Sequence, residues 1–178
     1  MSQVERISLA EDLNAADFFS YSSQSEDGRL CTVPYFKGTG RFSLTSIDEK
    51  DIKNRLKAVG TKLKKVRKGN RTLVIGTGEF MYVPMRIATE LGKGILFHST
   101  TRSPIFPHEN SLIFNKFRFN SPEHSGAVNY LYNILESDYD EVFVIIERVT
   151  NEAAIEELVA ILQQVKIPHI TIVTLANV

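Results

Sequence analysis

The chain is poor in cysteine, carries no net charge and contains no long apolar run. Its one cysteine, Cys31, cannot form a disulfide within the chain, which is typical of a reducing compartment. Lys+Arg and Asp+Glu both number 21, so no overall field attracts nucleic acid or an anionic membrane. The longest aliphatic run, residues 142–146, is far shorter than the ~20 residues of a membrane span. No apolar secretory segment follows the N-terminus, so we expect a cytoplasmic protein without membrane or nucleic-acid partners.

Length and composition fit one globular domain. The chain has 178 residues, of which 43% are hydrophobic and 24% charged, enough to bury a core of ordinary size. We find no repeat or linker that would separate a second domain. We therefore expect a single domain over residues 1–178, with an N-terminal extension and hairpin in 1–47 and an α/β core in 48–178.

The N-terminal third predicts mixed structure. Residues 9–19 read as a short helix and 20–29 as a loop. Two strands, 30–36 and 41–47, are expected to pair as a hairpin through a glycine-containing link. The apolar residues Ile52, Leu56, Val59, Leu63 and Val66 then predict an amphipathic helix that ends near residue 68. Its many basic residues, within 52–68, indicate a solvated face rather than a nucleic-acid site.

From residue 72 onward, strands alternate with helices. We expect strands at 72–76, 94–99, 142–146 and 170–175, and helices at 81–91, 121–135 and 151–165, with an alternating segment at 112–119. Such alternation predicts a parallel sheet with flanking helices, an α/β fold of the Rossmann-like kind. Ligands bind such sheets beyond the carboxyl ends of the strands, which selects loops 76–80, 98–107 and 147–152.

The first loop contains Gly76, Gly78 and Glu79. The glycines would allow a ligand to approach the backbone closely, and Glu79 is a candidate catalytic base or ribose ligand. The alternative is a tight strand-to-helix turn in which Glu79 stabilises the start of the helix. Neither a complete dinucleotide fingerprint nor a phosphate loop ending in Gly-Lys-Ser/Thr is present.

The second loop surrounds one arginine with hydroxyl groups. Arg102 offers a planar fork of donors for a phosphate or carboxylate, and Thr100, Thr101 and Ser103 add neutral donors. The alternative is an ordinary surface loop. His98 lies just before it, but the four histidines match no metal-ligand spacing, so no metal site is predicted.

The third loop resembles the phosphoribosyl-pyrophosphate signature of type I phosphoribosyltransferases. In that family an apolar strand ends in two acidic residues, before a Thr/Gly-rich loop that holds the 5-phosphate. Glu147 matches the first acid, whereas Arg148 replaces the second and 151–153 replace the Thr-Gly-Gly run. The resemblance implies a phosphoribosyltransferase-like fold and makes Glu147 a candidate catalytic residue. It also makes Arg148 and Thr150 candidate ligand contacts and Mg²⁺ the cofactor to consider.

A second resemblance covers about the last 110 residues. The segments 78–84, 99–105 and 129–133 are similar to motifs of the TRSP-domain family, named after its Thr-Arg-Ser-Pro tetrapeptide, here 101–104. That family occurs with phosphoribosyltransferase-like domains in bacterial gene clusters associated with tellurite resistance. The resemblance implies a partner phosphoribosyltransferase domain, or a second copy of the chain.

Asn129 is the last candidate ligand contact. Asn129 and Asn133 would share one face of the expected helix 121–135 and could bind a ligand or the loop backbone. Two functions remain open. The chain binds a phosphorylated ribose or nucleotide-like metabolite as an enzyme or half of one, or it is a non-catalytic companion of a phosphoribosyltransferase.

Overall fold

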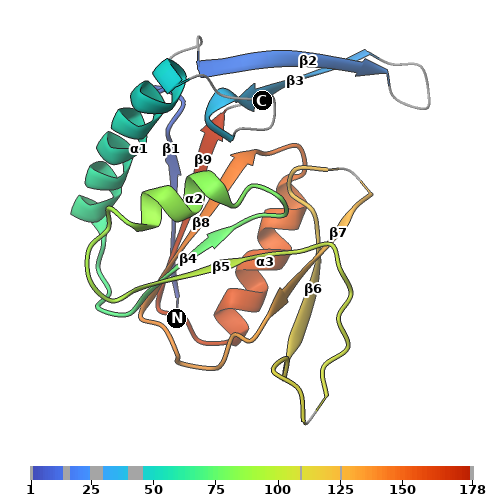
Figure 1. Cartoon of the computed structure of the whole chain (residues 1–178). Helices are drawn as coiled ribbons and strands as arrows, with labels where there is room; N and C mark the ends of the chain where they lie inside the picture. Colours follow the sequence, from blue (N-terminus) through green and yellow to red (C-terminus); the bar gives the residue numbers. More distant parts are fainter. Residues whose placement is uncertain are drawn as a thin grey trace.

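A five-stranded parallel sheet forms the centre of the computed structural model (Figure 1). The structure describes residues 2–13, 17–24, 30–39, 46–108, 110–124 and 126–176. The strand order is β1-β9-β8-β4-β5. The bounds are Gln3–Ser8 for β1, His169–Ala176 for β9, Glu141–Arg148 for β8, Thr72–Gly76 for β4 and Ile95–Ser99 for β5. The predicted α/β fold with a parallel sheet and flanking helices is confirmed.

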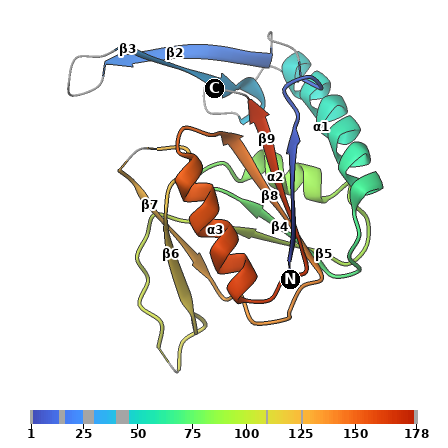
Figure 2. The same cartoon turned by 180° about the vertical axis from the view of Figure 1, so that it is seen from behind.

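Helices cover both faces of this sheet. Helices α1 (Ser46–Val66) and α2 (Tyr82–Ala88) lie on one face, and α3 (Glu152–Gln164) lies on the other (Figures 1 and 2). The strand β8 is buried along its whole length, because its side chains alternate between the two cores. Phe143 and Ile145 face α1 and α2, whereas Val142, Val144 and Ile146 face α3. This explains its continuous apolar sequence.

The amphipathic helix α1 buries most of the predicted stripe. Ile52, Leu56, Val59 and Leu63 belong to the core, and Val66 at the end of the helix is exposed. Among its basic residues, Arg55 pairs with Asp17 at 2.6 Å and Lys62 pairs with Asp12 at 2.6 Å. No helix in the described part of the chain is long and apolar enough to cross a membrane.

The predicted helix over 121–135 is wrong. This region contains a turn followed by β7 (Val128–Tyr132), which pairs antiparallel with β6 (Lys116–Asn120). Gly126 has a φ of +74°, a conformation that no right-handed helix contains. The segment 128–132 is rich in β-branched and aromatic residues, and pairing with β6 outweighs an apolar spacing that also fits a helix. Asn129 and Asn133 therefore share no helix face.

The N-terminal predictions are partly wrong. Leu9 begins a turn, in which the amides of Asp12 and Leu13 donate to its carbonyl oxygen, and β2 (Phe18–Gln24) replaces the end of the expected helix and the start of the expected loop. Residues 14–16 and 25–29 of these two predictions lie outside the described residues. The expected strand 30–36 is present as β3 (Leu30–Phe36), followed by η2 (Lys37–Thr39), but β3 pairs with β2. Residues 41–45 of its expected partner lie outside the described residues.

The strand β1 is an element that the sequence did not predict. It pairs parallel with β9 along its full length, from Gln3 opposite His169 to Ser8 opposite Thr174. The central sheet therefore includes residues from before position 48, so the α/β core is not confined to 48–178. The β2–β3 hairpin lies beyond the carboxyl ends of β8 and β9 (Figures 1 and 2).

Candidate functional site

The loops that follow β4 and β5 are joined at the carboxyl edge of the sheet. The hydroxyl oxygen of Thr100, a buried side chain, accepts a hydrogen bond from the backbone N–H of Gly78 at 2.7 Å. The backbone N–H of Thr100 donates to the carbonyl oxygen of Gly76 at 2.9 Å. Thr100, predicted to contact a ligand, is thus occupied in holding the two loops together.

The two glycines of the first loop have different roles. A Cβ at Gly76 would lie 2.5 Å from the carbonyl oxygen of Phe80 and 3.2 Å from the side chain of Pro84. Gly76 is therefore required by the packing of the turn into α2, and not by the approach of a ligand. Gly78 has a φ of +56°, and a Cβ there would face Glu123 Oε2 at 3.7 Å.

Glu123 is the central acidic group of this edge and was not predicted. It is buried, and its Oε1 accepts from the hydroxyl of Thr77 at 2.9 Å and from the backbone N–H of Glu147 at 3.1 Å. Burial raises the pKa of Glu123 to about 7, although these two hydrogen bonds and Arg148 act in the opposite direction. Near neutral pH this carboxyl can therefore both hold and release a proton.

One signal in the sequence could have identified Glu123. It is the only acidic residue between positions 110 and 134. In the predicted helix 121–135 this residue would lie in the first turn, where the helix dipole alone explains a carboxylate.

The Thr-Arg-Ser-Pro loop is braced by β7. Thr101 and Tyr130 exchange two backbone hydrogen bonds, of 3.0 and 2.7 Å, in an isolated antiparallel bridge. The Tyr132 hydroxyl donates to the carbonyl oxygen of Ser103 and accepts from the backbone N–H of Ile105, both at 2.7 Å. The backbone N–H of Ser103 also donates to Thr101 Oγ1 at 3.1 Å. The loop therefore has a fixed shape without any contribution from Arg102.

Arg102 and Asn129 flank this isolated bridge, one on each of the two segments that it joins. The side chain of Arg102 is exposed and forms no hydrogen bond or ion pair with the described residues. The amide of Asn129 is buried, and neither of its polar atoms has a described partner.

Glu147, the acidic residue of the third loop, is buried and already has hydrogen-bond partners. Glu147 is buried at the end of β8, and its Oε1 accepts from the backbone N–H of Phe36 at 2.8 Å. Its Oε2 lies 3.3 Å from Nη1 of Arg148, whose guanidinium stacks 4.2 Å from the ring centre of Tyr35. Arg148 and Glu147 thus form a buried ion pair covered by the β2–β3 hairpin, so neither contacts an open cleft.

Side chains of the protein itself also engage the start of α3. Asn151 caps the helix by accepting from the backbone N–H of Ala154 at 3.4 Å, and Glu152 pairs with Arg6 at 2.7 Å. Thr150 donates through both its backbone N–H and its hydroxyl to the carbonyl oxygen of Pro122, at 2.8 and 3.3 Å. Thr150 thus fastens the turn that carries Glu123, and its hydroxyl is already engaged with Pro122.

These residues do not fit a Mg²⁺ site. A cation replaces the second acid, and Glu147 already accepts from Phe36 and Arg148. Across the described ranges, no three His, Cys, Asp or Glu side chains gather in a way that could hold a metal ion. His98 lies in β5 with its pKa lowered by burial.

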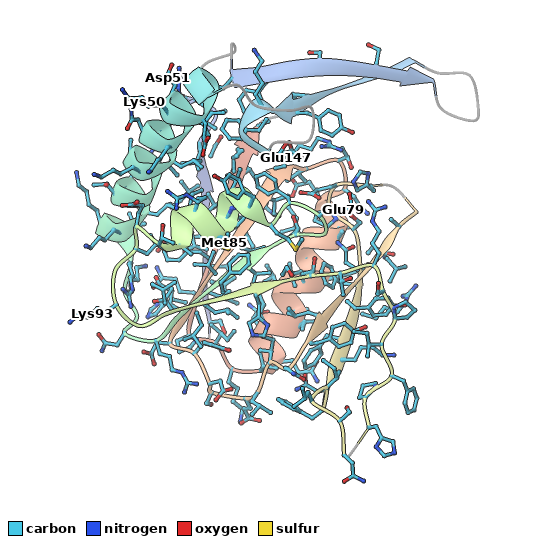
Figure 3. All side chains as sticks on the ribbon, viewed as in Figure 1. Lys50, Asp51, Glu79, Met85, Lys93 and Glu147 are labelled. Carbon is cyan, nitrogen blue, oxygen red and sulfur yellow. The ribbon has the colours of Figure 1, made fainter. Side chains whose placement is uncertain are left out.

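The structure places the three loops at one edge but does not join their charged groups. The strands β8, β4 and β5 are neighbours in the sheet. Glu147 lies at the end of β8, and Glu79 and Arg102 lie in the loops that follow β4 and β5. Figure 3 shows Glu79 and Glu147 toward the same end of the molecule. Glu79 is exposed and Glu147 is buried, and no described contact links either to Arg102.

This fold and the loops at its carboxyl edge define a phosphoribosyltransferase-like α/β protein. The family described as "TRSP domain C terminus to PRTase_2" matches residues 38–162, so the chain belongs to the TRSP-domain family. No curated protein sequence is recognisably similar to the chain.

Solved phosphoribosyltransferases share the fold. An adenine phosphoribosyltransferase from Giardia lamblia, complexed with 9-deazaadenine, has a TM-score of 0.60 at 13% identity, covering 97% of this chain and 86% of that one. The adenine phosphoribosyltransferase of Saccharomyces cerevisiae has a TM-score of 0.53 at 13% identity, covering 90% and 85%. A Staphylococcus aureus hypoxanthine phosphoribosyltransferase has a TM-score of 0.50 at 19% identity, covering 72% of this chain. The chain spans 64% of the length of that last protein. The protein is thus related to phosphoribosyltransferases in fold.

Proposed function

We propose that this phosphoribosyltransferase-related protein binds a phosphorylated ribose or nucleotide-like metabolite and that Arg102 holds its anionic group. The observation that carries this proposal is an exposed guanidinium with no described partner, on a loop that other residues hold in shape. An arginine that only braced the loop would be expected to bond to it. A fixed loop loses little conformational freedom when it binds, which favours affinity.

Transfer of a phosphoribosyl group is not what these residues favour. The carboxylate that would contact ribose hydroxyls is paired with Arg148, and the helix start that would bind the 5-phosphate is capped by Asn151 and carries Glu152. We therefore propose a site centred on Arg102 and the loop 76–80. The acidic groups nearest that loop, Glu79 and Glu123, could accept from ligand hydroxyls.

Arg102→Ala tests the binding proposal. We expect the variant to bind ribose 5-phosphate or AMP more weakly by roughly 1.5–3 kcal/mol, because one charge-assisted contact is lost. Its melting temperature should stay close to that of the wild type, since an exposed arginine without partners contributes no more than about 0.5 kcal/mol. Calorimetric titration and thermal unfolding measure the two quantities.

The matched control is Lys50→Ala. Lys50 is exposed at the start of α1, away from Glu79 in Figure 3, and its substitution removes the same charge. Equal loss of affinity in both variants would indicate a general charge effect. A fall in melting temperature with unchanged affinity in Arg102→Ala would make Arg102 structural and overturn the proposal.

Phosphoribosyl pyrophosphate with Mg²⁺ serves as a second probe in the same titrations. We expect weak or no binding, because Arg148 replaces the second acid and pairs with Glu147, and Glu152 would repel the 5-phosphate. Micromolar binding would contradict this interpretation of the third loop.

A non-catalytic companion of a phosphoribosyltransferase is the second candidate function. The closed Glu147–Arg148 pair favours it, as do the exposed apolar side chains near β6. These side chains are Ile105, Phe106, Leu112 and Phe114. Co-purification with a phosphoribosyltransferase from the same gene cluster, lost in Phe106→Ser, would support this function.

We place either function in a bacterial stress-resistance pathway of the tellurite type. The family resemblance supports this assignment. A deletion strain complemented with Arg102→Ala should then be as sensitive to tellurite as the uncomplemented strain, whereas the Lys50→Ala gene should restore resistance.

A further inference from the structure

Asn129 carries a side-chain amide that the described residues leave unsatisfied. The residue is 1% exposed, and both Nδ2 and Oδ1 are buried without a hydrogen-bond partner. The neighbouring Asn133 differs, because its Oδ1 accepts from the backbone N–H of Phe114 at 3.1 Å and its Nδ2 donates to the carbonyl oxygen of Leu112 at 2.7 Å. One asparagine of this hairpin is therefore structural and the other is not explained by the fold.

An unpaired buried amide lowers the stability of the folded protein. Folding removes its donor and its acceptor from water and returns no hydrogen bond for either. Leu131, two residues along the same face of β7, is fully buried in the core. Leucine has the same branching at Cγ and the same number of side-chain heavy atoms as asparagine, so it is the nearest apolar replacement at position 129 and would avoid this cost.

The position of Asn129 indicates what the amide is for. It lies on β7 opposite Phe119 and next to Tyr130, whose bridge to Thr101 joins β7 to the loop that carries Arg102. An uncommitted donor and an uncommitted acceptor thus lie on the strand that is bridged to the Arg102 loop. Residues that reduce stability in this way are typical of binding sites.

We propose that Asn129 is a specificity residue that binds a planar ligand group with one hydrogen-bond donor beside one acceptor. A primary amide, a lactam and the edge of a nucleobase share this chemistry, and each can form two parallel hydrogen bonds with a carboxamide side chain. The inference rests on the proposed binding function, since it specifies a second group of the ligand whose anionic group Arg102 holds.

The test uses the full chain and three uncharged probes. Adenine and uracil present nucleobase edges, and nicotinamide presents a primary amide, so the probes separate the two sources of this chemistry. Nitrogen-15 NMR follows the side-chain NH₂ signals of Asn129, which are assigned by their loss in Asn129→Leu. We expect at least one probe to shift these signals and Asn129→Leu to weaken its binding by at least about tenfold.

Asn133→Leu is the matched control. We expect it to lower the melting temperature, because it breaks two hydrogen bonds and places leucine at a φ of +55°, while the folded variant keeps its affinity for the probe. Asn129→Leu should keep or raise the melting temperature, because it removes an unsatisfied group. A gain in stability together with a loss of binding would assign Asn129 to the ligand.

Two results would overturn the inference. The first is that no probe shifts the Asn129 signals at millimolar concentration. The second is that Asn129→Leu loses stability as Asn133→Leu does and keeps its affinity, which would mean that a buried water satisfies the amide. Because the probes carry no anionic group, a failure of ribose 5-phosphate and AMP to bind would overturn only the role of Arg102.

Discussion

Three glutamates at one edge of the sheet show how the surroundings of a residue decide its chemistry. Glu79 is exposed, Glu147 is buried and paired with Arg148, and Glu123 is buried with a pKa of about 7. The sequence predicted Glu79 and Glu147 as functional and gave Glu123 no role. Only Glu123 combines burial with a proton that exchanges near neutral pH.

Glu123 makes stability depend on pH. Its pKa is raised in the folded protein, so its contribution to stability is fully present below about pH 4.5 and is lost as the pH rises through about 7. The glutamine side chain in Glu123→Gln cannot ionise. At about pH 8 the free energy of unfolding of this variant, measured with urea, should therefore exceed that of the wild type by up to roughly 3 kcal/mol. At about pH 4.5 the two proteins should be nearly equal.

Glu79→Gln is the control for this comparison, because it makes the same chemical change at an exposed position of a neighbouring loop. It should alter the free energy of unfolding by no more than about 0.5 kcal/mol. If Glu123→Gln were instead less stable than the wild type at about pH 8, the ionised carboxylate would stabilise the fold, which contradicts a raised pKa.

At the scale of elements, the β6–β7 hairpin departs most from the predicted helix 121–135. A helix would place Leu131 and Leu135 on the same face, one turn apart. In the structure Leu131 is fully buried in β7, whereas Leu135 lies beyond the strand and is 46% exposed. The hairpin brings the turn with Glu123, the bracing Tyr132 and Asn129 to the site.

Two leucine substitutions distinguish the hairpin from the helix. Leu131→Ala should lower the free energy of unfolding by about 2–5 kcal/mol, because it opens a cavity in the core beside α3. Leu135→Ala should cost no more than about 1 kcal/mol, because its side chain is largely in water already. Urea unfolding of both variants measures the difference, and equal costs would contradict the hairpin.

At the scale of the whole molecule, β8 makes one folding unit of two cores. Ile145 packs with α1 and α2, and the adjacent Ile146 packs with α3. A strand that supplies side chains to both faces cannot be lost from one core and kept in the other. We therefore expect the two cores to unfold together.

Paired alanine substitutions test this coupling. Ile145→Ala and Ile146→Ala should each cost about 2–5 kcal/mol and should each shift a single transition, whether unfolding is followed by circular dichroism or by tyrosine fluorescence. The two residues are neighbours with identical side chains, so each controls for the other. Separate transitions in either variant would show that the cores fold independently.

The sequence by itself determined the elements whose signal is local and repeated. The stripe of α1 has the helical period, β8 and β4 are continuous apolar runs, and α3 follows the N-cap residue Asn151. All four elements are found within a few residues of the predicted bounds. The motif at 101–104 also pointed to its family without a structure. Burial of one or both faces of such an element fixes which of its residues are apolar, so the pattern along the sequence predicts the element.

Tertiary structure decided what depends on pairing between distant segments. The strand β1 gains its place from β9, more than 160 residues later, and β7 becomes a strand because β6 lies beside it. The surroundings of the acids were decided in the same way. Phe36 and Arg148 occupy the carboxylate of Glu147, whereas burial and the hydrogen bond from Thr77 determine the pKa of Glu123. Hydrogen bonding and desolvation act between neighbours in space, and a linear sequence does not record which residues those are.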